Sequence, residues 1–262
     1  MGIFSVIFLI LDVILGVSIF VYYIINFKEV NSYFKYGAVL IGIICILELI
    51  SGALGMVNIA LSGVIYLKSI IMVCIGIHLS SKTGQVDIPL IKKLFRKGEG
   101  ETINVRNYII STAAVILGSV IFSYVLFKLT SPSMSQMIKK NLLDSTSFSE
   151  LTSAPTFQVL IELVAISIAE EITFRFVIQN YVAKIFKLEG KKYWIAIVFA
   201  AFIWALAHGN TLDPEWVKFA QIFPIGIALG GLYKKYGLES SMFAHAGFNV
   251  IMSFFAVGLI RM

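Results

Sequence analysis

The sequence predicts an all-α, polytopic membrane protein, and composition and hydropathy both support this fold class. Of the 262 residues, 58% are hydrophobic and only 14% are charged, and the mean hydropathy is +0.90. A soluble domain carries roughly a quarter charged residues, so the chain belongs in a bilayer. The net charge of +6 comes mostly from lysines between apolar runs, which indicates membrane topology and not nucleic-acid binding. We expect a multi-pass protein of the cell membrane, such as a bacterial plasma membrane.

The apolar runs predict the membrane spans one by one. A spanning helix needs about 20 mostly apolar residues. On this criterion we expect eight transmembrane helices in an all-helical bundle. They cover residues 3–26, 36–55, 58–78, 107–129, 156–183, 193–210, 216–233 and 240–260.

The distribution of Lys and Arg predicts the orientation of these spans. Cytoplasmic loops carry an excess of positive charge, and the odd-numbered loops hold most of it. We therefore expect residues 79–106, 184–192 and 234–239 in the cytoplasm and both termini outside. After the fourth span, Ser131 and Pro132 stand in helix-start positions and predict a short helix on the membrane surface.

Three ionisable residues interrupt the fifth span, within the stretch SIAEEITFR. Each unpaired charge in mid-membrane costs about 2.5–3.5 kcal/mol, so the chain needs a reason to keep them. Glu171 and Arg175 are four residues apart and share a helix face, which predicts an ion pair. Glu170 points about 100° away around the helix. A purely structural pair explains Glu171 and Arg175, whereas Glu170 is left to face a cavity.

Two histidines and an amide lie in later spans. In an alternative interpretation, His208 marks the carboxyl end of a helix. In the same interpretation, His245 and Asn249 form an interhelical hydrogen-bonding pair. Taken with Glu170, however, they form a hydrolytic set. A carboxylate activates water, an imidazole binds a metal or moves protons, and an amide stabilises an oxyanion. The sequence has no G-x-S-x-G or H-E-x-x-H motif, so serine hydrolases and zincins have no local support.

A further pair of charges lies in the hairpin of the second and third spans. Glu48 and Lys68 have opposite signs at similar depth, which favours an ion pair. The alternative is a protonated carboxyl group and a lysine that extends to the interface.

The order and spacing of these residues resemble the CPBP family, the CAAX prenyl-protease and bacteriocin-processing (Abi) intramembrane proteases. That family's motifs are EExxxR, FxxxH and HxxxN or HxxxD. The first and third match Glu170-Glu171-x-x-x-Arg175 and His245-x-x-x-Asn249. In the second, Trp204 stands four residues before His208 where Phe is usual. The resemblance covers about residues 150–255. We accordingly divide the chain into amino-terminal helices with a basic loop, 1–106, and a catalytic membrane core, 107–262.

The resemblance implies an intramembrane endopeptidase that cleaves membrane-associated or lipidated peptides. Glu170 would activate a water molecule, and Glu171 and Arg175 would fix the geometry. His208 would bind the water or a metal, while His245 and Asn249 would stabilise the oxyanion. Glu170, His208 and His245 would be the ligands of a divalent metal such as zinc. A metal-free glutamate–histidine mechanism is equally compatible with these residues.

Two other function classes compete with the peptidase. In the first, the protein is a non-catalytic membrane partner, such as a bacteriocin immunity protein or a scaffold for another membrane enzyme. In the second, it is a transporter with the buried acids as a proton relay. No inverted repeat or pair of broken helices is evident in the sequence, which disfavours the transporter. Only the enzyme needs Glu170 as a base.

Overall fold

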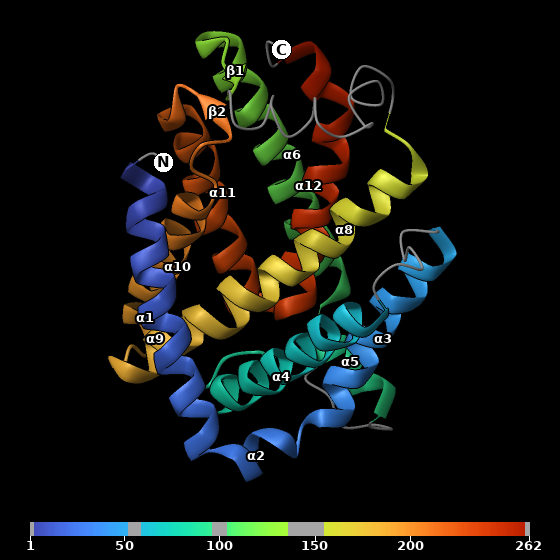
Figure 1. The fold of residues 1–262 in the computed structure, drawn as a ribbon, viewed down its shortest axis with the longest axis vertical. Helices are drawn as coiled ribbons and strands as arrows, with labels where there is room; N and C mark the ends of the chain where they lie inside the picture. The colour runs from blue at the N-terminus through green and yellow to red at the C-terminus, as the bar shows by residue number, and fades with distance from the viewer. Residues whose placement is uncertain (1–2, 52–58, 96–103, 136–154, 260–262) are drawn as a thin grey trace.

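The computed structural model describes residues 3–51, 59–95, 104–135 and 155–259. They form a bundle of helices with one small two-stranded sheet (Figure 1). The helices are α1 (Ile3–Ile25), α2 (Phe27–Asn31), α3 (Phe34–Ser51), α4 (Ile59–Thr83), α5 (Pro89–Phe95), α6 (Val105–Thr130), α8 (Phe157–Glu171), the π-helical segment η3 (Ile172–Gln179), α9 (Asn180–Ile185), the short 3-10 helix η4 (Gly190–Lys192), α10 (Tyr193–Ala207), α11 (Glu215–Tyr236) and α12 (Leu238–Leu259). The strands are β1 (Ser133–Met134) and β2 (Leu212–Asp213).

Long helical segments stand at all eight predicted positions within the described residues, with α8, η3 and α9 forming one continuous segment. By length and hydropathy, five helices of this part of the chain qualify as membrane spans. They cover Phe4–Ile25, Gly63–Thr83, Val105–Thr130, Gly190–Ala207 and Glu215–Tyr236. The polytopic membrane fold is therefore confirmed, whereas the number of eight spans stays a prediction. The two-part division at residue 106 also stays a prediction.

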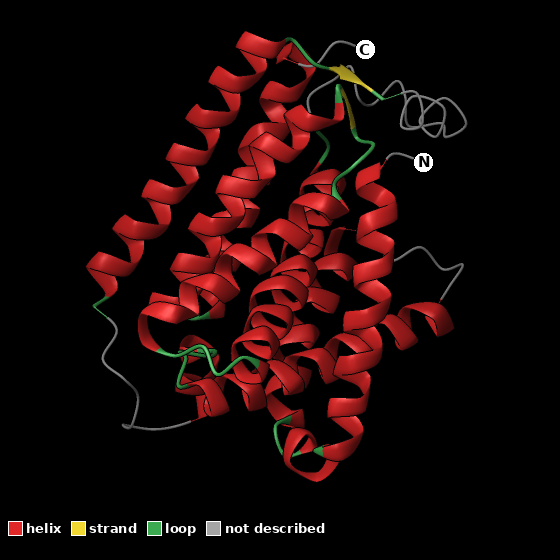
Figure 2. Cartoon of the chain, turned by 90° about the vertical axis from the view of Figure 1, so that its left-hand side faces the viewer, coloured by secondary structure: helices red, strands yellow, loops and turns green. Residues whose placement is uncertain are grey.

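The two ends of the bundle differ in the segments they gather (Figures 1 and 2). At the upper end, α1 and α11 begin, α6, α10 and α12 end, and β1 pairs with β2. At the opposite end lie α2, α5 and the connection between α9 and α10. We call this the basic end, because the odd-numbered loops predicted to be cytoplasmic lie there.

The prediction of a surface helix after the fourth span is wrong for the residues that the structure describes, which extend to residue 135. Ser131 caps the end of α6 in a left-handed conformation (φ 45°, ψ 55°). The next residues, Ser133 and Met134, pair antiparallel with Asp213 and Leu212. This pairing gives hydrogen-bond partners to backbone N–H and C=O groups that would lack them at the start of a helix. The remainder of the predicted helix lies outside the described residues.

A buried polar cluster ties four helices together below the π-helical segment. Nδ2 of Asn180 lies 2.8 Å from Phe176 O, 2.5 Å from Tyr233 Oη and 3.2 Å from Ser80 Oγ, and its two hydrogens are shared among these three oxygens. Tyr193 donates to Asn180 Oδ1 (2.6 Å). Asn180, Tyr193, Tyr233 and Ser80 are fully buried. Because their polar groups satisfy one another, the cluster holds α9, directly after η3, against α4, α10 and α11 without leaving these groups unpaired.

The turn between α11 and α12 lies inside the protein. Leu238 is fully buried, and its N–H donates to Asp87 O (2.7 Å). The Glu239 carboxylate accepts the backbone N–H groups of Leu90 (3.0 Å) and Ile91 (3.1 Å). Residues 87–91 thus cover the turn, and α12 starts at depth. Together with the oblique course of α8 (Figure 1), this allows side chains of α12 and α8 to meet at one level, although their distances from the helix ends differ.

The predicted pair of Glu48 and Lys68 is replaced by another contact. Tyr66, two residues before Lys68, donates a hydrogen bond to Glu48 Oε2. The ion pairs among the described residues do not include Glu48 with Lys68. Lys68 and Tyr66 lie on different faces of α4, because two residues correspond to about 200° of rotation. A hydrogen bond from a phenol is therefore one of the contacts that stabilise the Glu48 carboxylate.

The close packing of α4 on η3 predicts that one methyl group added at this contact lowers the stability of the protein. A Cβ atom added to Gly76 would lie 2.3 Å from Cδ1 of Phe176, whose side chain is fully buried. We expect Gly76→Ala to destabilise the protein by about 1–3 kcal/mol through overpacking. Thermal unfolding in detergent measures this. Gly63→Ala on the same helix is the control, because nothing lies within 4 Å of the added atom; equal stability of the two variants would contradict the described packing.

Candidate active site

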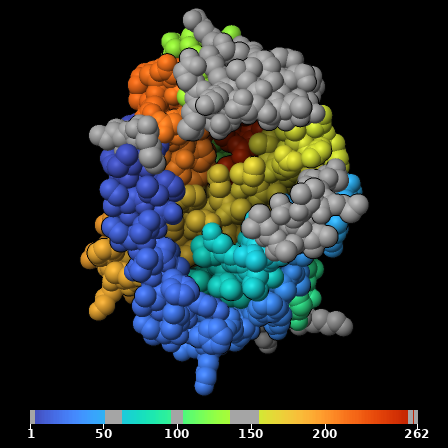
Figure 3. Space-filling view, viewed as in Figure 1, coloured from blue at the N-terminus to red at the C-terminus, as the bar shows by residue number. Residues whose placement is uncertain are grey.

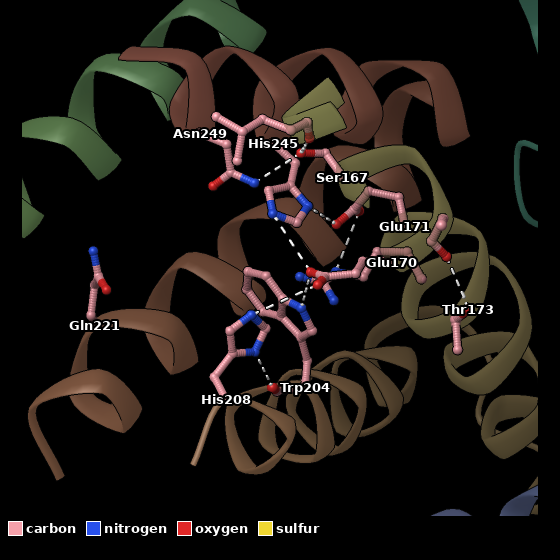
Figure 4. A network of polar contacts seen from close by, with 12 residues as sticks. Ser167, Glu170, Glu171, Thr173, Trp204, His208, Gln221, His245 and Asn249 are labelled. Atoms are coloured by element: carbon pink, nitrogen blue, oxygen red, sulfur yellow. Dashed lines mark hydrogen bonds and ion pairs between the residues drawn. The ribbon is translucent and has the colours of Figure 1, made fainter. Parts of the chain in front are cut away.

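Three helical segments bring the predicted site residues together (Figure 4). Glu170 and Glu171 are the last residues of α8, and His208 directly follows α10. His245 lies two turns into α12. Residues that are far apart in sequence therefore converge on one carboxylate, that of Glu170.

The predicted pair of Glu171 and Arg175 is present and completely buried. Arg175 Nε lies 3.5 Å from Glu171 Oε2, and both side chains are 0% exposed. His245 Nδ1 lies 2.9 Å from the other oxygen, Oε1. Glu171 thus joins the cation of η3 to the imidazole of α12. Because a buried charge without its partner is strongly destabilising, these groups hold one another in place.

Arg175 pairs with Glu171 although the helix is not an α-helix at this point. The π-helical segment begins directly after Glu171 and contains Arg175. Such segments are rare and often lie at functional sites. Among the described residues, no hydrogen bond is formed by the three guanidinium nitrogens of Arg175, and its Cζ lies 4.2 Å from the ring centre of Trp204. The cation is therefore held by an ion pair and by the face of an indole ring.

Trp204 contacts four side chains of the site, those of Glu170, Arg175, His208 and His245. Its indole N–H donates to Glu170 Oε2 (2.7 Å). Its ring centre lies 5.2 Å from that of His208 and 5.0 Å from that of His245, both nearly perpendicular. The motif position where Phe is usual in the CPBP family therefore carries a hydrogen-bond donor that Phe lacks. The sequence analysis treated this residue only as an aromatic substitute.

Glu170 is the carboxylate of the site with room to react. Its Oε1 lies 3.8 Å from His208 Nε2, and its Oε2 lies 3.8 Å from His245 Nε2. The side chains of Glu170 and His208 are 24% and 22% exposed, whereas that of His245 is only 2% exposed. Figure 3 shows a recess between α8 and α11 with atoms of α12 at its floor. Glu170 and His208 are thus the accessible members of the site.

The hydrogen bonds of the two imidazoles determine which ring nitrogens are free. His208 Nδ1 lies 2.9 Å from the backbone oxygen of Trp204, and His245 Nδ1 faces a carboxylate. Both partners only accept, so each Nδ1 carries the hydrogen. A neutral imidazole then presents a lone pair at Nε2, and both lone pairs are directed at Glu170. A water molecule that donates hydrogens, or a cation, satisfies such a set of acceptors.

The donor set fits a metal in chemistry and in orientation. Two imidazoles and one carboxylate are common zinc ligands, and ligating histidines usually donate their other N–H to a carboxylate or a carbonyl. In the described part of the chain, however, no three His, Cys, Asp or Glu side chains are grouped closely enough to form a metal site. The metal ligands Glu170, His208 and His245 therefore stay a prediction.

Asn249 lies beside the site and contacts another residue. Its Nδ2 donates to Ser167 Oγ (2.9 Å), while Ser167 donates to Leu163 O (2.7 Å). This bond fixes α12 against α8 one turn before Glu171. One of the two amide hydrogens of Asn249 is used in this way.

Lys218 is a charged neighbour that the sequence analysis counted only for topology. Its Nζ lies 3.0 Å from Gln221 Oε1, and Gln221 donates to Ser123 Oγ (2.9 Å). The Lys218 ammonium interacts electrostatically with Glu170. Lys218 lies one turn into α11, and its interaction with Glu170 could be found only from the fold.

Comparison with known proteins agrees with the motifs. Residues 152–251 match the family model described as type II CAAX prenyl endopeptidase Rce1-like, which confirms the resemblance to the CPBP family. The sporulation-killing factor biosynthesis protein SkfC of Bacillus subtilis (strain 168) is 31% identical over 87 residues. That match covers 33% of this chain and only 17% of SkfC. No solved structure matches the chain.

The different surroundings of the two adjacent acids predict different effects of the same substitution. Glu171→Gln leaves the Arg175 cation buried without its partner, and we expect a loss of about 3–5 kcal/mol of stability. Glu170→Gln is the matched control, because the amide oxygen still accepts from Trp204 and the side chain is partly exposed. Thermal unfolding in detergent compares them. Equal destabilisation by both substitutions would contradict the separate roles of the two carboxylates.

Proposed function

Starting from the Rce1-like match of residues 152–251, we propose that this protein is an intramembrane endopeptidase that hydrolyses membrane-associated peptides. The observation that carries the proposal is the free oxygen of Glu170. Its Oε2 accepts the Trp204 N–H (2.7 Å), and its Oε1 faces His208 Nε2 at 3.8 Å. That distance is too long for a direct hydrogen bond and suits one bridging water.

A water molecule at this position is oriented for attack. It donates one hydrogen to Glu170 Oε1 and the other to His208 Nε2, because both atoms are acceptors. Its oxygen lone pairs then point away from the protein groups and toward a peptide carbonyl. As the water attacks, Glu170 takes the proton and later returns it to the leaving amine, as a general base and then a general acid.

The remaining groups fix the geometry and stabilise charge. Glu171 and Arg175 orient His245, whose Nε2 lies 3.8 Å from Glu170. The proposal requires a second proton on His245 Nε2 during the reaction, beside the Glu171 carboxylate that faces Nδ1, because only an Nε2–H can donate to the oxyanion of the tetrahedral intermediate. Asn249 has a second amide hydrogen beyond the one donated to Ser167, which is available for the same oxyanion.

A divalent metal such as zinc also belongs to this proposal. Glu170, His208 and His245 would hold it, and the ion would polarise the peptide carbonyl and acidify a bound water. With the ion bound, the Nε2 atoms of His208 and His245 would be its ligands and would no longer bind the water or donate to the oxyanion, and the ion would supply the charge stabilisation in their place.

The location of the site supports the class of substrate. The groups lie within a helical membrane bundle, so the scissile bond must be delivered from the bilayer or from its surface. A peptide with an apolar segment or a covalently attached lipid meets this requirement. The name of SkfC refers to the biosynthesis of a sporulation-killing factor, which supports a role of this protein in the maturation of a secreted or membrane-delivered product.

Removal of the base tests the proposal directly. We expect Glu170→Gln to lower the rate of peptide cleavage by about 10²–10⁴-fold, because the amide cannot take a proton from water. Purified protein is incubated with a library of membrane-associated peptides, and the products are identified by mass spectrometry. Glu162→Gln is the control, since Glu162 is an exposed acid on the same helix whose partner is Gln158. The same variant is also compared with the unchanged protein in cells. If Glu170→Gln leaves the cellular function of a stable protein intact, the proposed peptidase is wrong, and an immunity or scaffold function takes its place.

A further inference from the structure

We propose that one exposed face of α1 binds a membrane-spanning helix of another protein, and that this partner helix carries a Lys or Arg side chain near its middle. The face consists of Leu9, Asp12, Gly16 and Phe20, and we call it the Asp12 face. It shares no residue with the candidate active site, so the proposal does not depend on peptidase activity.

The first step concerns the charge of this face. Asp12 is the one charged residue of α1, and α1 qualifies as a membrane span over Phe4–Ile25. At 1.5 Å per residue, Asp12 lies about 12 Å from the start of this span and about 20 Å from its end. Asp12 is exposed. Among the residues that the structure describes, its side chain takes part in no hydrogen bond or ion pair.

The second step concerns the surroundings of the carboxyl group. At 100° per residue, the four residues of the Asp12 face lie within about 80° of one another around the helix. Leu9 is 52% and Phe20 is 61% exposed, and side chains as apolar as these face hydrocarbon in a span of this hydropathy. Another side of α1, with Leu11 and Leu15, packs against the core. A charged side chain in hydrocarbon is costly, and such groups usually pair with an opposite charge.

The third step concerns the shape of the face. Gly16 follows Asp12 by one helical turn, and nothing lies within 4 Å of a Cβ atom added there. Packing within the chain therefore does not require this glycine. In membrane helices, a small residue lets the backbone of a second helix approach closely. A helix that packs on Gly16 would bring its own side chains beside the Asp12 carboxyl group. The charge and the shape of the face thus indicate the same kind of occupant.

A second copy of this chain does not meet the requirement through the same face. A twofold contact joins identical surfaces, so two α1 helices packed in this way would bring two Asp12 carboxyl groups together. Like charges at one interface repel each other. The partner must therefore be a helix that supplies a cation, which is the side chain of Lys or Arg within a span.

Model helices of known sequence test the proposal. The full chain is reconstituted in phosphatidylcholine liposomes with synthetic peptides of about 23 Leu and Ala residues, which are long enough to span the bilayer. One peptide has a single Lys at its centre, and the matched peptide has Leu there. The protein carries a donor dye on Lys191→Cys, an exposed position, after Cys45 and Cys74 have been replaced by Ala. The peptides carry the acceptor, so energy transfer measures their association with the protein.

We expect the Lys peptide to associate about tenfold more tightly than the Leu peptide, because it offers a partner to the carboxyl group. Asp12→Asn should abolish this difference, whereas Asp12→Glu should retain it. Gly16→Leu should weaken the association of the Lys peptide by hindering close approach. Gly118→Leu on α6 is the matched control, since nothing lies within 4 Å of a Cβ atom added at that exposed position either.

Equal association of the two peptides with the protein would overturn the proposal, and this comparison needs no change of Asp12. A preference for the Lys peptide that persists in Asp12→Asn would also overturn it, because another group would then bind the cation. Energy transfer between donor-labelled and acceptor-labelled copies of the protein alone, lost in Asp12→Asn, would assign the face to a second copy and contradict the partner proposed. None of these outcomes depends on peptide cleavage.

Discussion

The fully buried ion pair of Glu171 and Arg175 is the interaction on which the rest of the site depends. In a bilayer, a guanidinium away from water must be neutralised within the protein. Glu171 does this and at the same time accepts from His245, so one carboxylate fixes both η3 and α12. Trp204 covers the cation and donates to Glu170. Because all these groups are committed, Glu170 Oε1 is left as the reactive acceptor.

Much of this arrangement could be predicted from the sequence. The apolar runs locate the long helices to within a few residues, because a lipid environment requires continuous helices. The i,i+4 spacing predicts the pair of Glu171 and Arg175, and the different direction of Glu170 follows from the same helical geometry. Motif order identifies His208 and His245 as partners of Glu170, which the fold then brings within 3.8 Å.

Other features depend on tertiary contacts that no local pattern encodes. The buried start of α12, covered by residues 87–91, decides the depth of His245. The π-helical segment depends on packing against α4, where Phe176 meets Gly76. The donor role of Trp204 and the proximity of Lys218 to Glu170 are also set by neighbouring helices.

A double-mutant cycle on Glu171 and Arg175 tests the central claim most directly. The free energy of unfolding is compared for Glu171→Gln, Arg175→Met and the double variant. If the pair is a mutually dependent buried unit, the double variant is more stable than the sum of the single losses predicts, because it leaves no uncompensated buried charge. A coupling free energy of about 1–3 kcal/mol is the expected result. Additive losses would show that the two charges act independently, and the account of the site built on them would be wrong.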